Sequence, residues 1–219
     1  MELISPAIFR IQNKTFHSNT YLVFDQLTSK CVIIDPGFDY DLLIKNLLYN
    51  KFNPLAIIAT HGHFDHVAGV NAIQKTFNIP FYIHERELGN LKKNNFLLKI
   101  SKMKLSIDNP VPDYTFTNEF ELIKIQDFCF SIYNYPGHTE GSCIIQYSNH
   151  LFTGDTLYKN RLGVENNFGE DIKKLKISLS KIYNNFDNNH IVFPGHGSYD
   201  YLINIMQNNR EVNDFLLSF

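Results

Sequence analysis

The chain has 219 residues, of which 44% are hydrophobic and 19% are charged, and its formal net charge at pH 7 is −2. These values are typical of one large globular domain and exclude a disordered tail. A net charge this small, without a stripe of lysine and arginine, argues against nucleic acid as a partner. The length suits one large domain or at most two small ones, and no linker rich in Gly, Ser or Pro divides the chain, so we predict a single domain over residues 1–219.

Three cysteines, Cys31, Cys129 and Cys143, occur singly in apolar runs, without the spacing of a paired metal or redox motif. We expect all three to be buried and reduced. The first residues lack the features of an export signal, and no apolar run approaches transmembrane length. These features predict a cytoplasmic protein with no membrane partner, and they leave the oligomeric state open.

Short β-branched and aromatic runs predict strands at 7–12, 20–25 and 30–35, and leucines at helical spacing predict a helix at 39–50. A strand at 55–60, a helix ending near Asn78, a strand at 79–84 and a helical segment at 85–104 follow. Further strands are predicted at 120–125, 127–133, 142–147 and 150–155. A helix through Ile172 and Ile182, a strand within 189–197 and helical structure at 199–219 complete the pattern. Two similar halves are indicated, and two sheets packed face to face with helices outside would bury the apolar runs.

Residues 59–69, ATHGHFDHVAG, contain three of the nine histidines and begin where the strand at 55–60 ends. Residues two apart in an extended segment point the same way, so His61 and His63 can bind one ion. Adjacent side chains diverge by roughly 100° where a helix begins, which directs Asp65 and His66 to a second ion. Imidazole and carboxylate ligands without thiolates suit a catalytic zinc, iron or manganese site. The alternative for Asp65 is a helix cap.

Three later loops place a potential ligand directly after a glycine: His138 in NYPGHTEGS, Asp155 in LFTGDTL and His196 in VFPGHGS. A glycine lets the backbone approach a packed centre closely, as several loops converging on one site require. The other histidines have no such setting, and we interpret them as structural or surface residues: His17, His84, His150 and His190.

The motifs THGHFDH, PGHTEGS, TGDTL and PGHG, with IIDPG before them, resemble the ordered motif set of the metallo-β-lactamase superfamily over residues 20–200. The resemblance implies an α+β fold of four layers, αββα, with two mixed β-sheets between the helices. It also implies two divalent ions, with zinc favoured and iron or manganese as alternatives. The implied ligands are His61, His63 and His138 for the first ion, Asp65, His66 and His196 for the second, and Asp155 bridging both.

Asp35, in IIDPG, is not an implied ligand in this family. It would brace the metal loop from behind, and the alternative is a simple turn residue. Two ions roughly 3.5 to 4 Å apart lower the pKa of a shared water toward about 7, so the expected nucleophile is a metal-bound hydroxide, which Asp65 would orient. A thiolate leaving group, with a pKa near 8.5, needs little help from a general acid, which suits a thioester.

Within the superfamily, the chain most resembles the glyoxalase II-like hydrolases, which cleave thioesters such as S-lactoylglutathione. Only residues 197–219 follow the last implied ligand, so we expect the glutathione site of the longer glyoxalase II proteins to be absent. Related enzymes often continue GDTLF with Gly-Arg-Thr-Asp, whereas this chain has Val164 and Asn166 near those positions. Arg161 is the candidate to replace that arginine in substrate binding.

Other activities of the superfamily share part of this pattern. A persulfide dioxygenase would use one iron, and its last motif would usually read Pro-Ala-His-Asp instead of PGHG. A lactonase would use both ions on an ester. A flavodiiron reductase would need a glutamate at the position of His63 and a flavin domain, and we expect neither here. A non-catalytic protein would be expected to have lost ligands, whereas all seven implied ligands are present. We therefore predict a metal-dependent hydrolase of thioesters, with the dioxygenase and the lactonase as alternatives.

Overall fold

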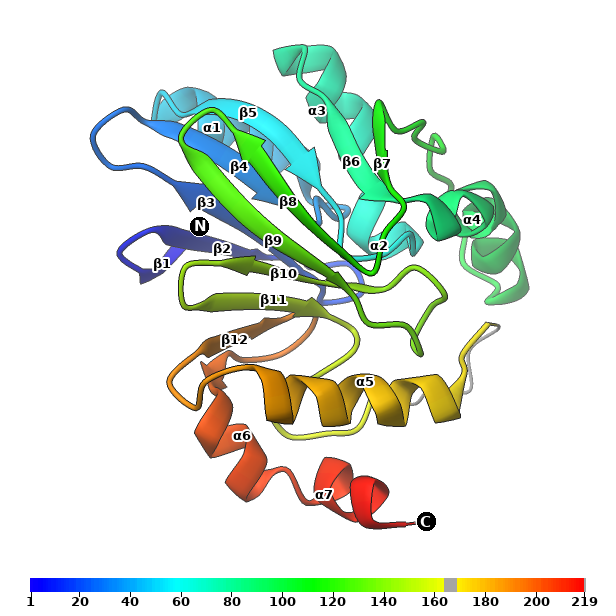
Figure 1. Ribbon diagram of the computed structural model, residues 1–219. Coiled ribbons are helices and arrows are strands. Elements are labelled where there is room, and N and C mark those ends of the chain that lie inside the picture. Colours follow the sequence, from blue (N-terminus) through cyan, green and yellow to red (C-terminus); the bar gives the residue numbers. More distant parts are fainter. Residues whose placement is uncertain (164–168, 219) are drawn as a thin grey trace. The chain divides into compact units, whose positions relative to one another are not determined.

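The computed structural model describes residues 1–163 and 169–218. The chain forms two compact units, Met1–Phe116 and Thr117–Phe219, and each contains one mixed sheet with helices (Figure 1). Val164 and Asn166, which mark the departure from the Gly-Arg-Thr-Asp pattern, lie outside the described residues.

The sheet of the first unit has seven strands. Their spatial order is β1 (Glu2–Ser5), β2 (Ile8–Gln12), β3 (Asn19–Phe24), β4 (Lys30–Ile34), β5 (Asn53–Ile58), β6 (Phe81–His84) and β7 (Tyr114–Phe116). Neighbours are antiparallel from β1 to β4 and parallel from β4 to β7. The sequence patterns do not predict β1 and β7, which are short strands at the edges of this sheet and have largely exposed side chains.

The helices of this unit are α1 (Tyr40–Tyr49), α2 (Phe64–Val67), α3 (Val70–Phe77), the 3-10 turn η1 (Glu85–Glu87) and α4 (Leu88–Ile100). Leu43 of α1 and Ile73 of α3 pack in one apolar core with Ile33 and Ile57 of the sheet. Within α1 the adjacent Leu42 is exposed, because a helix buries only one stripe of its surface.

Parallel pairing brings the carboxyl ends of three strands to one edge of this sheet. Ile34 at the end of β4 pairs with Ile58 at the end of β5, and β5 pairs in parallel with β6. Asp35 therefore emerges on one side of the histidine segment that follows β5, and η1, which follows β6, emerges on the other side. Residues far apart in the sequence meet here because each follows a neighbouring strand.

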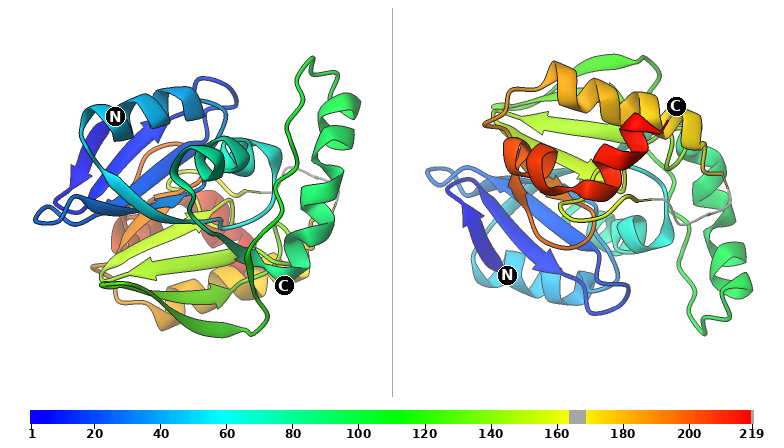
Figure 2. Two further views of the ribbon diagram at one scale, coloured as in Figure 1. Left: turned by 90° about the horizontal axis from the view of Figure 1, so that it is seen from above. Right: turned by 90° about the horizontal axis from the view of Figure 1, so that it is seen from below.

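The second unit has a six-stranded sheet. Its spatial order is β13 (Asp200–Tyr201), β12 (Ile191–Pro194), β11 (His150–Gly154), β10 (Cys143–Tyr147), β9 (Phe128–Asn134) and β8 (Phe120–Ile125). All neighbours are antiparallel except β11 and β12. The helices α5 (Ile172–Asn185), α6 (Leu202–Asn208) and α7 (Arg210–Leu217) bury Leu179, Ile205 and Val212 against the sheet core (Figure 2).

The expectation that all three cysteines are buried is wrong for Cys129. Alternation along β9 turns Phe128 and Phe130 inward and Cys129 outward, where it is exposed. Cys31 and Cys143 are buried, and burial raises the pKa of the Cys31 thiol to about 12. No disulfide joins the three within the described ranges.

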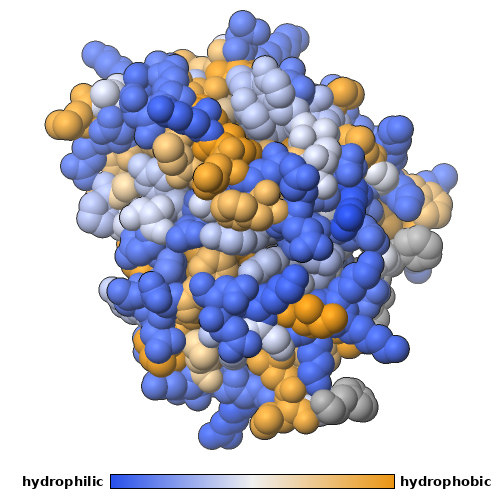
Figure 3. Space-filling model, viewed as in Figure 1, coloured by the Kyte–Doolittle hydropathy of each residue, from blue (hydrophilic) through white to orange (hydrophobic). Residues whose placement is uncertain are grey.

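No helix in the described part of the chain is long and apolar enough to cross a bilayer. Apolar residues are interspersed among polar ones on the face drawn in Figure 3. Single exposed apolar side chains, such as Leu122 of β8, are ordinary on a folded protein.

Candidate metal centre

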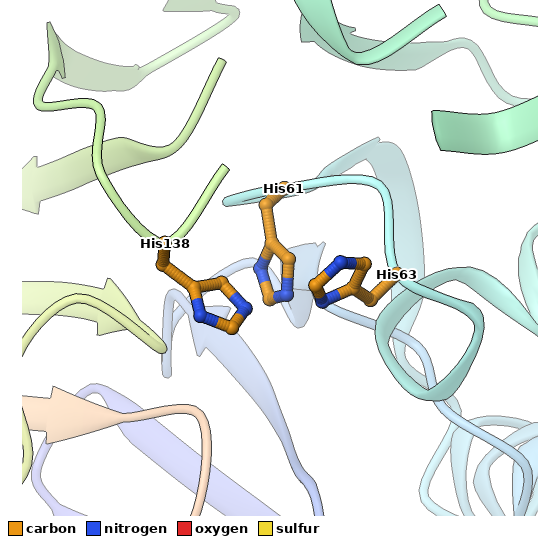
Figure 4. Close-up of side chains that lie close together, drawn as sticks. All are labelled: His61, His63 and His138. Atoms are coloured by element: carbon orange, nitrogen blue, oxygen red, sulfur yellow. The ribbon is translucent and has the colours of Figure 1, made fainter. Parts of the chain in front are cut away.

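Four potential ligands lie together in the first unit, on the loop after β5 and on α2. We call His61, His63, Asp65 and His66 the N-terminal donor set. The ring of His61 lies 4.8 Å from that of His63, edge-on at 81°, and 4.2 Å from that of His66, measured between centroids. Figure 4 shows His61 and His63 on this segment and also labels His138, on the loop after β9. His61, Asp65 and His66 are buried.

The helix-cap interpretation of Asp65 is wrong. The residue that caps α2 is His63, in an extended conformation, and its side chain makes no capping bond. Asp65 lies inside the helix, and its Oδ2 is 3.6 Å from Nε2 of His66. The Asp65 carboxylate therefore lies beside an imidazole nitrogen of the same short helix.

Asp35 supports the N-terminal donor set from the end of β4. Its Oδ1 accepts a hydrogen bond from the backbone N–H of Thr60 at 2.7 Å, and its Oδ2 accepts one from the Thr60 hydroxyl at 2.7 Å. Nδ1 of His66 lies 3.0 Å from the same Oδ2. Although ligand atoms of Asp35, His61 and His66 lie within 4.8 Å of one another, three donors already occupy the Asp35 carboxylate.

These contacts set the tautomers of two histidines. The single hydroxyl proton of Thr60 goes to Asp35, so the Thr60 oxygen accepts from Nδ1–H of His61, 3.1 Å away. Nδ1–H of His66 is donated to Asp35 itself. Nε2 therefore carries the lone pair in both imidazoles, which is the form that binds a cation, and a carboxylate behind the ring is the usual support for such a ligand.

Three further potential ligands meet in the second unit. We call His138, Asp155 and His196 the C-terminal donor set. Oδ2 of Asp155 lies 3.6 Å from Nε2 of His138 and 3.5 Å from Nε2 of His196. Parallel pairing of Gly154 with Pro194 explains the second contact, because Asp155 and His196 each follow the carboxyl end of one of these strands.

The separations within both sets fit the spacing of ligands around one ion. Two ligands bonded to zinc at about 2.0 to 2.1 Å in tetrahedral geometry lie about 3.4 Å apart. Three imidazole–carboxylate distances fall at 3.5 to 3.6 Å, which is longer than a hydrogen bond between such groups. Donor chemistry and spacing in each unit therefore fit a divalent cation.

Glycines before the ligands have the role expected from the sequence at two positions. Gly137 has φ +144°, and a Cβ there would lie 2.3 Å from Cα of Leu175, so only glycine lets the loop of His138 pack on α5. Gly154 also has positive φ, 48°. Its carbonyl accepts from the N–H of Gly195 at 2.7 Å, which ties the two loops that carry Asp155 and His196.

Arg161, the candidate substrate contact, is exposed and lies over the ring of Tyr158, with its guanidinium carbon 4.3 Å from the ring centroid. Tyr158 is buried, and its ring lies 6.3 Å from that of His196. Asn209 donates to the carbonyls of both Tyr158 and Arg161, at 3.0 and 3.1 Å. The ring of Tyr158 thus lies close to both the positively charged guanidinium of Arg161 and His196 of the C-terminal donor set.

Several supporting residues are absent from the sequence-based site. Besides Thr60, Ser18 donates its hydroxyl to the carbonyl of Asp65 at 2.8 Å, and Thr20 donates to the carbonyl of Asp35 at 2.8 Å. Oε1 of Glu170 lies 3.6 Å from Nδ1 of His138. Thr60 could have been found from the sequence, because it is a polar residue at the end of an apolar strand and directly precedes His61. Ser18, Thr20 and Glu170 carry no such local signal.

The four remaining histidines lie outside both donor sets. His17 is exposed, His84 accepts from the N–H of Arg86 at 3.2 Å, and Nδ1 of His190 contacts the carbonyl of Asp187. Burial lowers the pKa of His150 below its ordinary value of 6.5. These contacts agree with the structural or surface roles expected from the sequence.

Comparison with known proteins gives consistent matches over most of the chain. The sequence profile of the metallo-beta-lactamase superfamily matches residues 13–215. The hydroxyacylglutathione hydrolase GloC of Haemophilus influenzae is 29% identical over 192 residues, 84% of this chain and 87% of that protein. The crystal structure of the B3 metallo-beta-lactamase BLEG-1 has a TM-score of 0.86 at 32% identity and covers 94% of this chain and 99% of its own. TTHA1623 in a di-iron-bound form has a TM-score of 0.81 at 26% identity, with coverages of 92% and 98%.

These matches confirm the predicted fold class, two mixed sheets with helices. The His and Asp donors described above belong to the motifs on which the sequence resemblance rests. The chain belongs to the metallo-β-lactamase superfamily.

Proposed function

We propose that this metallo-hydrolase holds two divalent ions, zinc in the first instance, and cleaves thioesters of 2-hydroxy acids such as S-lactoylglutathione. Membership of the superfamily supports a metal-dependent hydrolase. The relative GloC, named as a hydroxyacylglutathione hydrolase, supports the substrate class. TTHA1623, solved in a di-iron-bound form, supports a binuclear centre and makes iron the first alternative metal.

The seven residues of the two donor sets divide between the ions by the superfamily pattern. Asp155 carries the proposal, because its Oδ2 lies within 3.6 Å of a histidine assigned to each ion, His138 and His196. One carboxylate oxygen shared in this way is what a bridging ligand requires. The proposed assignment is His61, His63 and His138 for the first ion, and Asp65, His66 and His196 for the second.

Two bound ions would lower the pKa of water toward about 7 and polarise the substrate carbonyl. The chain itself supplies orientation: Asp35 and Thr60 keep the lone pairs on Nε2 of His61 and His66. The Asp65 carboxylate accepts a hydrogen bond from the attacking water and so directs its lone pair at the carbonyl carbon. The thiolate leaves as an anion, since its conjugate acid has a pKa near 8.5, and no general acid is required.

Arg161 would attract a carboxylate of the thiol portion of the substrate. Its guanidinium is stacked on Tyr158, which holds the cation in one place. An anionic thiol such as glutathione fits this arrangement better than a neutral lactone does. The proposed role predicts an increase in KM, with little change in kcat, when Arg161 is replaced.

The test combines metal content with a substrate panel. Elemental analysis of the purified protein should find close to two ions per chain, and S-lactoylglutathione should be hydrolysed faster than a lactone or a β-lactam. One iron per chain with oxygen uptake on glutathione persulfide would establish the dioxygenase instead. Preferential lactone cleavage would establish the lactonase, and preferential β-lactam cleavage would assign the activity named for BLEG-1.

A further inference from the structure

We propose that Glu87 and Asn94 are positioning residues that hold the two peptide groups of Gly62 and thereby fix the relative orientation of His61 and His63 for metal binding. The assignment rests on the proposed function, because it takes these two histidines as ligands. It adds two residues that no metal motif of the chain contains.

The two contacts are made to opposite sides of one glycine. Oε2 of Glu87 accepts a hydrogen bond from the N–H of Gly62 at 2.7 Å, and Nδ2 of Asn94 donates to the carbonyl of Gly62 at 2.9 Å. That N–H belongs to the peptide group shared with His61, and that carbonyl belongs to the peptide group shared with His63. Both peptide planes are therefore fixed, and with them the directions in which the two imidazoles leave the backbone.

The two residues act from one helical face. Glu87 ends η1 directly before α4, and Asn90 and Asn94 follow it at spacings of three and seven residues, with Leu91 buried between them. Asn90 donates its Nδ2 to the same Oε2 of Glu87 at 2.9 Å. Asn90 of α4 therefore holds the Glu87 carboxylate in place. Glu87 in turn holds the loop after β5 that carries His61 and His63.

Packing alone does not favour these side chains. Glu87 and Asn94 are both fully buried, with 0% exposure, and burying a carboxylate or an amide costs free energy unless hydrogen bonds offset it. Oδ1 of Asn94 has no hydrogen-bond partner among the described residues, so its amide is satisfied on one side only. A leucine would fill the space of Asn94 without that cost. Core packing therefore does not explain Glu87 and Asn94. Both are hydrogen-bonded to Gly62, between His61 and His63, and this contact points to a positioning role.

Gly62 itself fits this interpretation. Its φ is not positive, so the position does not need glycine for its backbone conformation. A Cβ there would lie 2.9 Å from Oε2 and 3.3 Å from Cβ of Glu87. The glycine of THGHFDH therefore provides room for the Glu87 carboxylate to reach the backbone.

The test compares E87A, E87Q and N94L with E85A, which removes an exposed carboxylate from the same turn. Three quantities are measured: zinc affinity by competition with a chromophoric chelator, the absorption spectrum of the cobalt-loaded protein, and hydrogen exchange of residues 59–66 in the metal-free protein. E87A should weaken zinc binding by about 10- to 100-fold, alter the cobalt bands and speed exchange of this segment. E87Q keeps an oxygen acceptor for Gly62 and should lie closer to the parent protein than E87A does.

N94L separates positioning from stability. Leucine removes the donor to Gly62 but also removes the half-satisfied amide, so zinc affinity should fall by about 10-fold or more while the metal-free protein melts no earlier than E87A. Zinc affinities of E87A and N94L within about threefold of E85A would overturn the proposal. So would a lower melting temperature accompanied by unchanged metal affinity and an unchanged cobalt spectrum, because that is the result of a purely structural role.

Failure of the proposed function gives a different result. A parent protein that binds zinc but cleaves no thioester contradicts the proposed substrate, whereas the affinity, spectrum and exchange of the variants still decide the role of Glu87 and Asn94. A parent protein with no zinc or cobalt affinity overturns both proposals.

Discussion

Replacing Thr60 with valine tests the support of the metal loop most directly. Thr60 is buried at 1% exposure, and its hydroxyl donates to Asp35 at 2.7 Å and accepts from Nδ1 of His61 at 3.1 Å. Valine has nearly the same volume, so little cavity forms and the change isolates the hydroxyl. Both the stability of the metal-free protein and its metal affinity should fall.

The magnitude follows from the two lost contacts. A hydrogen bond to a charged group contributes about 1.5 to 3 kcal/mol, and the Nδ1–H of His61 loses this acceptor at a cost of about 1 to 3 kcal/mol. The two contacts share one oxygen and are not additive, so we expect a loss of about 2 to 4 kcal/mol in the free energy of unfolding. Zinc affinity should fall by about 10- to 100-fold, since the tautomer of His61 is no longer fixed.

Urea unfolding of the metal-free protein measures the first quantity, and chelator competition measures the second. Thr60→Ser is the matched control, because it keeps the hydroxyl and loses one methyl group, at a cost of about 1 kcal/mol. If Thr60→Val matches Thr60→Ser within about 0.5 kcal/mol and about threefold in zinc affinity, the proposed relay from Asp35 through Thr60 to His61 is refuted.

Three further predictions concern the ligands, a glycine and a buried histidine. His66→Ala and His196→Ala should each lower metal content toward one ion and reduce thioester turnover by at least about 100-fold; near-normal turnover would contradict the binuclear mechanism. Gly137→Ala forces a Cβ to 2.3 Å from Cα of Leu175, so it should lower the free energy of unfolding by more than about 2 kcal/mol in urea, and a neutral result would contradict the packing argument. Burial lowers the pKa of His150, so the unfolded chain binds its proton first and stability is lost as the pH falls through about 6.5. His150→Phe should reduce that loss between about pH 7 and about pH 5, as measured by urea unfolding, and an unchanged pH dependence would show that His150 does not contribute.

Local patterns predict most of the elements and all seven proposed ligands. The strand at 55–60 and the histidines after it are adjacent in sequence, and so are the glycine and ligand of each later loop. A short apolar run bounded by polar residues is enough to indicate a strand end, and the residue types there indicate the chemistry. Cys129 is a local failure, because the alternation of β9 that exposes it is visible in the sequence.

The sequence by itself determined which donors exist, in which order, and on which kind of backbone corner. Only the tertiary structure decided what holds them: Thr60 between Asp35 and His61, and Glu87 and Asn94 on either side of Gly62. Each of these contacts joins residues that follow different strands of one sheet or lie on a helix beyond it. A glutamate or asparagine at such a position has an ordinary identity in the sequence, and its burial and hydrogen-bond partner arise only when parallel strands bring their carboxyl ends to one edge.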